Sequence, residues 1–182
     1  MSSQRGRSEA EAQKQELLQR LHVEGQALLD SVSGLDEDEL SQSGVVGEWS
    51  AQDVIAHVGW WERQTLRALE AAFDYRDEDS RAKAVYSWLD WSGGLEALNA
   101  QAYLEERDRS LDELLADHMN TFNRIIEILE AAPADWLTTT AGPNAEQDSD
   151  KEVRIARDTC EHFREHASAI LDWRRRTFGE TP

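Results

Sequence analysis

Three histidines in this chain have the chemistry and the spacing to bind one metal ion. His162 and His166 are four residues apart in the segment CEHFREH near the C-terminus, and His57 lies much earlier. On an α-helix a spacing of four places two side chains on one face, with Cβ atoms about 5–6 Å apart. A third imidazole from another helix would complete a three-nitrogen site with an open position, the arrangement of catalytic zinc.

The competing interpretation is that the spacing is incidental. A chain with five histidines can contain such a pair by chance, and a histidine beside an apolar helix face is often only structural. His118 lies in the centre of an apolar stripe, where it is either a fourth ligand or a packed core or pocket residue, and the latter is favoured. His22 borders a stripe and is interpreted as structural. Cys160 points about 200° away from His162 on a helix, which favours a small buried hydrophobe over a ligand.

The carboxylates near the histidines give no clear general base. Glu161 and Glu165 flank the pair but lie about 100° off its face. Either could orient an imidazole by accepting its second N–H, although solvated carboxylates are the favoured interpretation. Glu48 and Glu62 are equally open to both interpretations.

Tryptophan is the second unusual feature, with seven residues in the chain. Trp60 and Trp61 are adjacent, so on a helix they cannot face the same way. One is predicted to pack inside and the other to line a pocket, a groove or a partner surface. Trp61 and Trp91, together with His118, are therefore the candidates for an aromatic pocket beside the metal. Ordinary core and interface packing is the favoured alternative.

The composition excludes several classes of function. The 182 residues include 37 acidic and 19 basic side chains, for a formal charge of -18. Such a surface repels nucleic-acid backbones and anionic membranes, so neither is an expected partner. The one cysteine rules out an intramolecular disulfide. No apolar run approaches the roughly 20 residues that span a bilayer, and the N-terminus lacks a signal peptide pattern. A soluble cytoplasmic protein is expected.

Long amphipathic helices must position these residues. Apolar side chains at spacings of three and four predict helices over about 8–33, 50–73, 110–132 and 149–178. A short turn is expected at 36–40. Capping boxes mark three of the starts, with Ser50 and Asp53, with Ser110 and Glu113, and with a third box over 149–152. Pro133 and Gly179 are predicted stops.

The remaining segments connect these helices. Residues 84–107 carry short helical pieces interrupted by Gly93 and Gly94, and residues 134–148 are predicted to form a loop. No segment alternates as a strand would, and no repeat is present. The chain is therefore predicted to be all-α, a four-helix bundle with a long crossover between helices 2 and 3. It is expected to form a single domain over 1–182, with residues 1–7 flexible.

Placed on this scheme, the histidines occupy two helices. His57 falls in the first two turns of the second helix, and His162 and His166 fall in the first half of the fourth. If these helices are neighbours with the same ends together, the three imidazoles converge, because bundle interiors build metal sites from facing helices.

Two motifs carry a family resemblance. The segment EWSAQDVIAHVGWWE, residues 48–62, resembles the start of the second helix in the DinB-like (DinB/YfiT) superfamily of four-helix bundles. The pair His162 and His166 matches the family's His-x-x-x-His on the last helix. The crossover and third helix, over residues 98–111, are most similar to the ClbS/DfsB branch. The resemblance covers nearly the whole chain after the first few residues.

The resemblance implies a metal site and an activity. Many members bind a divalent metal, often nickel or zinc, through residues that match His57, His162 and His166. Some relatives are transferases or isomerases that use a low-molecular-weight thiol such as bacillithiol or mycothiol. The ClbS branch is linked to self-protection by hydrolysis of a reactive cyclopropane electrophile. Dimers are frequent, so a homodimer is the implied assembly.

These observations lead to three hypotheses. The first is a metal-dependent hydrolase or thiol-dependent transferase acting on a small electrophilic molecule, with a detoxification or self-protection role. The second is a non-enzymatic bundle that binds or sequesters a small molecule. The third is a metal-free ClbS-like hydrolase that uses carboxylates or tyrosines. The sequence specifies no catalytic residue, metal or substrate.

Overall fold

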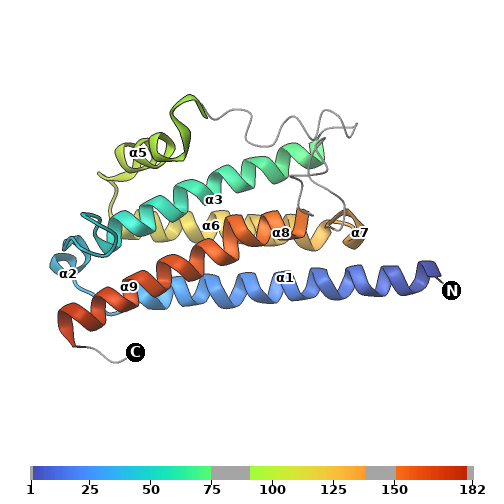
Figure 1. Cartoon of the computed structure of the whole chain (residues 1–182), viewed down its shortest axis with the longest axis horizontal. Coiled ribbons are helices and arrows are strands. Elements are labelled where there is room, and N and C mark those ends of the chain that lie inside the picture. The colour runs from blue at the N-terminus through green and yellow to red at the C-terminus, as the bar shows by residue number, and fades with distance from the viewer. Residues whose placement is uncertain (1, 75–90, 138–150, 180–182) are drawn as a thin grey trace.

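The computed structural model describes residues 2–74, 91–137 and 151–179. Within these ranges the chain is helical and contains no strand, only an isolated bridge between Val46 and Trp49. The all-α prediction is therefore confirmed. Among the described residues, the bundle is built from α1 (Ser2–Val32), α3 (Ala51–Asp74), α6 (Leu111–Ala131) and α9 (His162–Phe178), the last preceded by α8 (Lys151–Ala156) (Figure 1).

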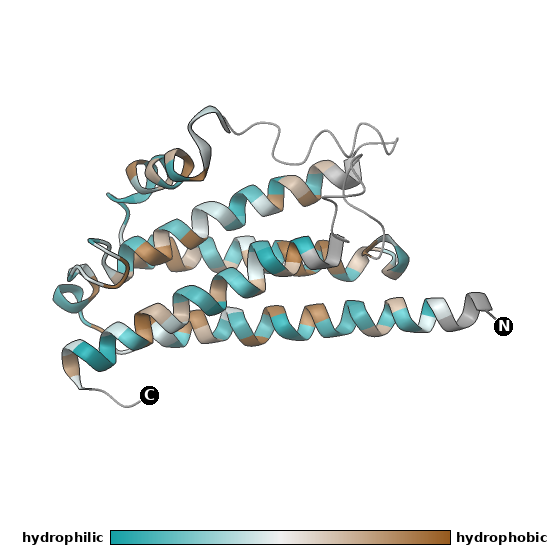
Figure 2. Ribbon diagram, viewed as in Figure 1, coloured by the Kyte–Doolittle hydropathy of each residue, from teal (hydrophilic) through white to brown (hydrophobic). Residues whose placement is uncertain are grey.

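The long helices pack mainly as two pairs. α1 lies along α9 and α3 lies along α6, while α3 and α9 contact each other over a shorter stretch (Figure 1). Apolar and polar residues alternate around each helix (Figure 2), and the apolar faces meet in one core. No helix in the described ranges combines the length and the apolarity that crossing a membrane requires. The largest fully buried side chains of this core include Leu17, Leu21, Leu28, Ile125, Leu129, Phe163 and Ile170.

Helix boundaries follow the capping residues that the sequence indicated. The Ser110 hydroxyl accepts the backbone N–H of Glu113, whose carboxylate accepts the N–H of Ser110, so α6 begins as predicted. The short helix α2 (Glu37–Ser41) begins at a similar box on Asp36. α9 ends at Gly179, whose φ of 72° is the left-handed conformation that glycine adopts without strain.

Several elements differ from the prediction. α1 begins at Ser2 rather than near residue 8, because each added residue extends an existing helix by one hydrogen bond. The predicted loop after Pro133 starts with a helical turn, α7 (Ala134–Leu137), which buries Leu137. Residues 138–150 lie outside the described residues, as does part of the predicted box over 149–152. The crossover prediction also falls largely on undescribed residues, 75–90.

The described part of the connection between α3 and α6 contains η1 (Trp91–Gly93) and α5 (Gly94–Glu106). Gly94 has a φ of 70°, which explains why a glycine stands where the chain turns into α5. α5 lies outside the bundle and runs beside the N-terminal half of α3 (Figure 1).

The last helix contains a π-helical segment, η2 (Arg157–Glu161), directly before His162. The hydroxyl of Thr159 donates to the carbonyl oxygen of Ile155 at 2.6 Å, a local bond that competes with regular helix geometry. The sequence predicted one uninterrupted helix here. π segments widen a helix by about one residue in a turn and often occur next to functional sites.

Candidate metal centre

His57 is held in place by the well-defined start of α3. The backbone N–H of Ser50 donates to the Asp53 carboxylate at 2.9 Å, and the Asp53 N–H donates to the Ser50 hydroxyl at 3.2 Å. This cap fixes the first turn, and His57 follows in the second turn with only 5% of its surface exposed. The indole of Trp49, just before the cap, lies against the His57 ring with centroids 5.1 Å apart.

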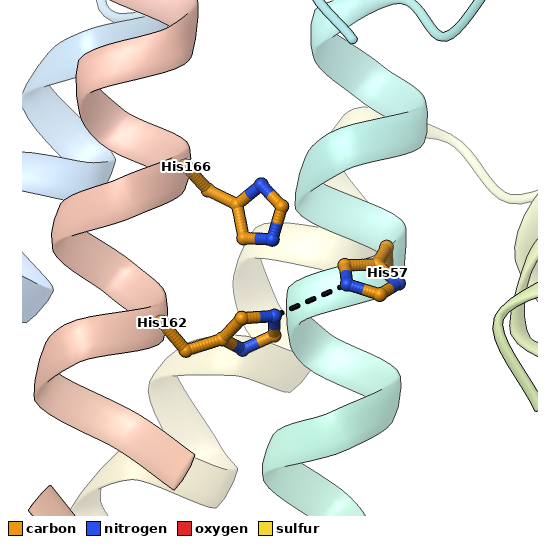
Figure 3. A group of neighbouring side chains, drawn as sticks. All are labelled: His57, His162 and His166. Atoms are coloured by element: carbon orange, nitrogen blue, oxygen red, sulfur yellow. Dashed lines mark hydrogen bonds between the residues drawn. The ribbon is translucent and has the colours of Figure 1, made fainter. Parts of the chain in front are cut away.

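The other two histidines project from α9 toward α3 (Figure 3). The Nε2 atoms of His57 and His162 are 3.1 Å apart. The His166 ring centroid lies 5.0 Å from that of His57 and 4.5 Å from that of His162. One ligand atom from each of the three residues lies within 4.8 Å of the others. The structure thus brings together the three histidines that the sequence singled out.

The site keeps its imidazoles neutral. Burial first, and the nearby His166 second, lower the pKa of His57 to about 3. Burial, followed by the charges of His166 and His57, lowers the pKa of His162 to about 2. Burial also lowers the pKa of His166, against a smaller opposing effect of Glu165. At neutral pH all three rings therefore offer nitrogen lone pairs, the form that binds metal.

The geometry fits a divalent ion. Two nitrogens bound to one tetrahedral ion at about 2.1 Å stand about 3.4 Å apart, close to the 3.1 Å between His57 and His162. The Nδ1 atoms of His57 and His166 are buried without a hydrogen-bond partner in the described residues. Three clustered imidazoles, two of them with an unpartnered buried nitrogen, are costly in a core that is only structural. His57, His162 and His166 therefore fit a three-nitrogen metal site.

Comparison with known proteins identifies the family. The sequence profile of the DinB superfamily matches residues 20–168. The chain belongs to the DinB superfamily. Members of this superfamily often bind metal, in agreement with the three histidines found together here. The ClbS/DfsB branch and any particular metal are not shown by this match.

A solved structure shares the DinB fold. An uncharacterised protein from Escherichia coli UTI89 superposes with a TM-score of 0.71 at 15% sequence identity, over 91% of this chain and 94% of that one. At this identity the likeness establishes the fold alone. The comparison with curated proteins gave no significant match.

No carboxylate belongs to the ligand group found among the described residues of this DinB-superfamily chain. Glu161 and Glu165 are exposed, and Glu161 lies 3.8 Å from Arg20 on α1. Glu48 is exposed as well. The favoured interpretation of solvated carboxylates describes Glu161 and Glu165, and Glu48, which was left open, is also solvated.

His118 takes part in a separate buried pair. Its Nδ1 lies 2.5 Å from Oε2 of Glu62 on α3, and both side chains are almost fully enclosed. Burial raises the pKa of Glu62, and the hydrogen bond to His118 lowers it less. The second oxygen, Oε1, is buried without a hydrogen-bond partner in the described residues. The His118 ring packs edge-on against Phe163 with centroids 5.8 Å apart, which places it in the core as the sequence favoured.

The buried role of Glu62 was missed by the sequence interpretation. The signal was present, because Glu62 falls in the buried stripe of α3 between Val58 and Thr65. A carboxylate at a position that should be apolar predicts a buried partner.

The other candidates are not in the ligand group found among the described residues, or their side chains are not described. Trp61 donates its indole N–H to Asn99 of α5 at 3.1 Å, in the α3–α5 interface. The side chain of Trp91 lies outside the described residues. His22 is exposed beside Phe122. Cys160 is buried, and burial raises the pKa of its thiol.

Proposed function

We propose that this chain is a metal-dependent enzyme, a hydrolase or a thiol-dependent transferase, that acts on a small electrophilic molecule. The observation that carries the proposal is the group of three neutral imidazoles from α3 and α9, two buried and one half-buried, with Nε2 atoms of His57 and His162 3.1 Å apart. Membership of a superfamily whose members often bind metal supports it.

His57, His162 and His166 would hold the metal, with zinc and nickel as the proposed ions. Three protein nitrogens leave at least one coordination position for another molecule. A bound divalent ion would act as a Lewis acid and would lower the pKa of a water or a thiol. The chain itself supplies neutral donors, a fixed His57 at a capped helix start, and an enclosed surrounding that limits access of water.

The substrate class follows from charge and surroundings. With a formal charge of -18, the protein repels anionic ligands, so a neutral or cationic small molecule is favoured. Trp49 gives the site an apolar side next to His57. A role in detoxification or self-protection in the cytoplasm is part of this proposal.

Metal content tests the proposal. Protein produced without a histidine tag is expected to carry about one divalent ion per chain, measured by elemental analysis. His57→Ala and His162→Ala should reduce this to background, because each removes one of three ligands. His22→Ala is the matched control, since it removes an exposed histidine from α1. Undiminished metal in His162→Ala would overturn the assignment.

A metal-free hydrolase is the second candidate, and the Glu62–His118 pair is the observation that favours it. A carboxylate within 2.5 Å of an imidazole is an arrangement that can move protons. Activity that resists chelators and is lost in Glu62→Gln would support this candidate. Activity lost on chelation and restored by zinc or nickel would support the first.

A further inference from the structure

α5 is attached to α3 by specific polar contacts as well as by packing. The indole N–H of Trp60 donates to Glu105 at 2.6 Å, and that of Trp61 donates to Asn99 at 3.1 Å. Trp60 also packs with Leu98 and Ala102 in a small apolar cluster separate from the main core. Two adjacent tryptophans of α3 therefore both serve the attachment of α5.

A group of alternating charges fixes the C-terminal end of α5. The Arg63 guanidinium donates to Glu106 and to Asp117, each at 2.5 Å. Arg109 donates to the same two carboxylates, at 2.7 and 2.9 Å. Glu106 is only 6% exposed, and the two arginines provide its buried carboxylate with hydrogen-bond donors. We call these four residues the α5 clamp, and it joins α3, α5 and α6.

α5 reaches the histidine site through a continuous series of rings. Tyr103, three residues before Glu106, stacks on Trp49 with planes 9° apart and centroids 6.2 Å apart. Trp49 in turn lies against His57, with centroids 5.1 Å apart. Tyr103 and Trp49 are both half-buried, so part of each ring remains accessible. The position of α5 thus determines the aromatic surface beside one metal-binding histidine.

We propose that α5 forms the outer wall of the metal centre, and that the Trp49–Tyr103 stack selects ligands with a flat apolar group next to their metal-binding atom. This inference rests on the proposed function, because it places the ligand's donor atom on a metal held by the three histidines. Aromatic rings favour stacked or edge-on contact with other flat groups. Arg63 and Arg109 are paired with Glu106 and Asp117, so these two arginines are not free to recruit anions to the wall.

Two ligands that share a metal-binding hydroxamate group, one with a methyl and one with a phenyl substituent, test the wall. Tag-free protein is loaded with Co²⁺, and acetohydroxamate and benzohydroxamate are titrated separately while the visible absorption of the bound cobalt is recorded. Benzohydroxamate should bind about tenfold more tightly than acetohydroxamate, after correction for their relative affinities for free Co²⁺. In Tyr103→Ala this preference should fall to about twofold, because Trp49 then loses the ring that stacks on it and holds it beside His57.

Leu104→Ala is the matched control. It shortens the neighbouring side chain on α5, which is 63% exposed, and should leave the preference unchanged. Glu106→Gln weakens the α5 clamp and should reduce the preference while leaving Tyr103 in place; the surface variant Glu127→Gln should not. An equal preference in wild type and Tyr103→Ala overturns the proposal.

The visible absorption of cobalt in the absence of either hydroxamate shows whether the metal site exists. It therefore separates failure of the wall proposal from failure of the proposed function. If cobalt binds and the preference for benzohydroxamate does not depend on Tyr103, the proposal about the wall is wrong and the proposed metal site is retained. If no cobalt binds, the proposed function fails. Calorimetric titration of the metal-free protein with benzohydroxamate then tests whether the wall binds an aromatic group on its own. Binding that Tyr103→Ala weakens would support an aromatic wall, and the absence of binding would overturn it.

Discussion

The two groups of histidines inside this bundle differ in what their nitrogens contact. His57, His162 and His166 lie close together, and two of them have buried Nδ1 atoms without a partner in the described residues. His118 instead lies 2.5 Å from a buried carboxylate of Glu62. The first group brings ring nitrogens of three histidines together, whereas the second pairs one ring nitrogen with a carboxylate. Three ligand atoms within 4.8 Å of one another, rather than burial alone, mark the first group as a binding site.

The same difference predicts opposite contributions to stability. The clustered neutral imidazoles lose hydration and leave two Nδ1 atoms without a partner in the described residues, so they destabilise the metal-free fold until a metal binds. The Glu62–His118 pair joins α3 to α6, and removal of one partner leaves the other buried alone. Measurements of unfolding should reveal this difference between the two groups of histidines.

Metal binding should give the largest effect. Free Zn²⁺ at about 1,000 times its Kd should raise the free energy of unfolding by about 4 kcal/mol, because the ion binds only the folded arrangement. Urea denaturation with chelator or with zinc measures this difference. His22→Ala should keep the full increment and His162→Ala should lose most of it. An equal zinc-dependent rise in the free energy of unfolding in His162→Ala would contradict the assignment of metal binding to the first group.

Breaking the buried pair should have the next largest effect. Glu62→Leu should destabilise the metal-free protein by about 3 kcal/mol, because His118 then lacks its buried acceptor. The double variant Glu62→Leu/His118→Leu should recover most of this loss, since no polar group remains unpaired. Urea denaturation reports both values, and metal content should stay unchanged. Loss of metal in Glu62→Leu would show that the two groups are coupled.

Acid should destabilise the fold through the histidines of the first group, because their pKa values in the folded protein are lower than in the unfolded chain. For His57 the folded value is about 3 against 6.5 unfolded, so the unfolded state binds more protons below pH 6.5 and stability falls there. Between pH 7 and pH 5 this amounts to about 2 kcal/mol for His57. His57→Gln should reduce the pH dependence of metal-free unfolding by that amount.

Protonation of Glu62 should change the folding stability in the opposite direction to protonation of His57. Its raised folded pKa means that the native state takes up the proton first, so its contribution to stability increases as pH falls toward 4.5. Glu62→Gln should therefore make the acid loss of stability steeper. An identical pH profile for His57→Gln and wild type would contradict the assignment of acid sensitivity to the three histidines.

The smallest effect should be a gain in stability. His166→Leu should stabilise the metal-free protein by about 1 kcal/mol, because it removes a buried ring with an unpartnered Nδ1. His118→Leu should destabilise it, because Glu62 then loses its partner. Thermal unfolding of the two variants in the presence of chelator measures the contrast. Destabilisation by both variants would mean that His166 also has a structural role.

Local signals predicted much of this architecture. The boxes at Ser50 and Ser110 mark helix starts because they satisfy backbone groups within four residues. Pro133 and Gly179 mark helix ends for equally local reasons. The prediction that His57 would lie beside the pair on the last helix depended on which helices are neighbours, and no local sequence rule specifies this.

Contacts between distant elements explain what the sequence did not reveal. Glu62 and His118 are far apart in the chain, so each was interpreted on its own and the pair was missed. The stack of Tyr103 on Trp49 depends on where α5 lies against α3, which the α5 clamp determines. The turn of α7 follows Pro133 directly and buries Leu137, a contact that appears only after folding.

The π segment before His162 has a consequence for how relatives are aligned. The buried positions Ile155, Thr159, Phe163 and Ala167 advance in steps of four, each about 40° beyond a full turn of a regular α-helix. The wider turn at Arg157–Glu161 absorbs this drift, as a single inserted residue would. A homologue without the insertion would present the same His-x-x-x-His pair at the same place in space. A one-residue gap inside this helix is therefore an expected evolutionary event, and an alignment that forbids it would misplace one end of the helix.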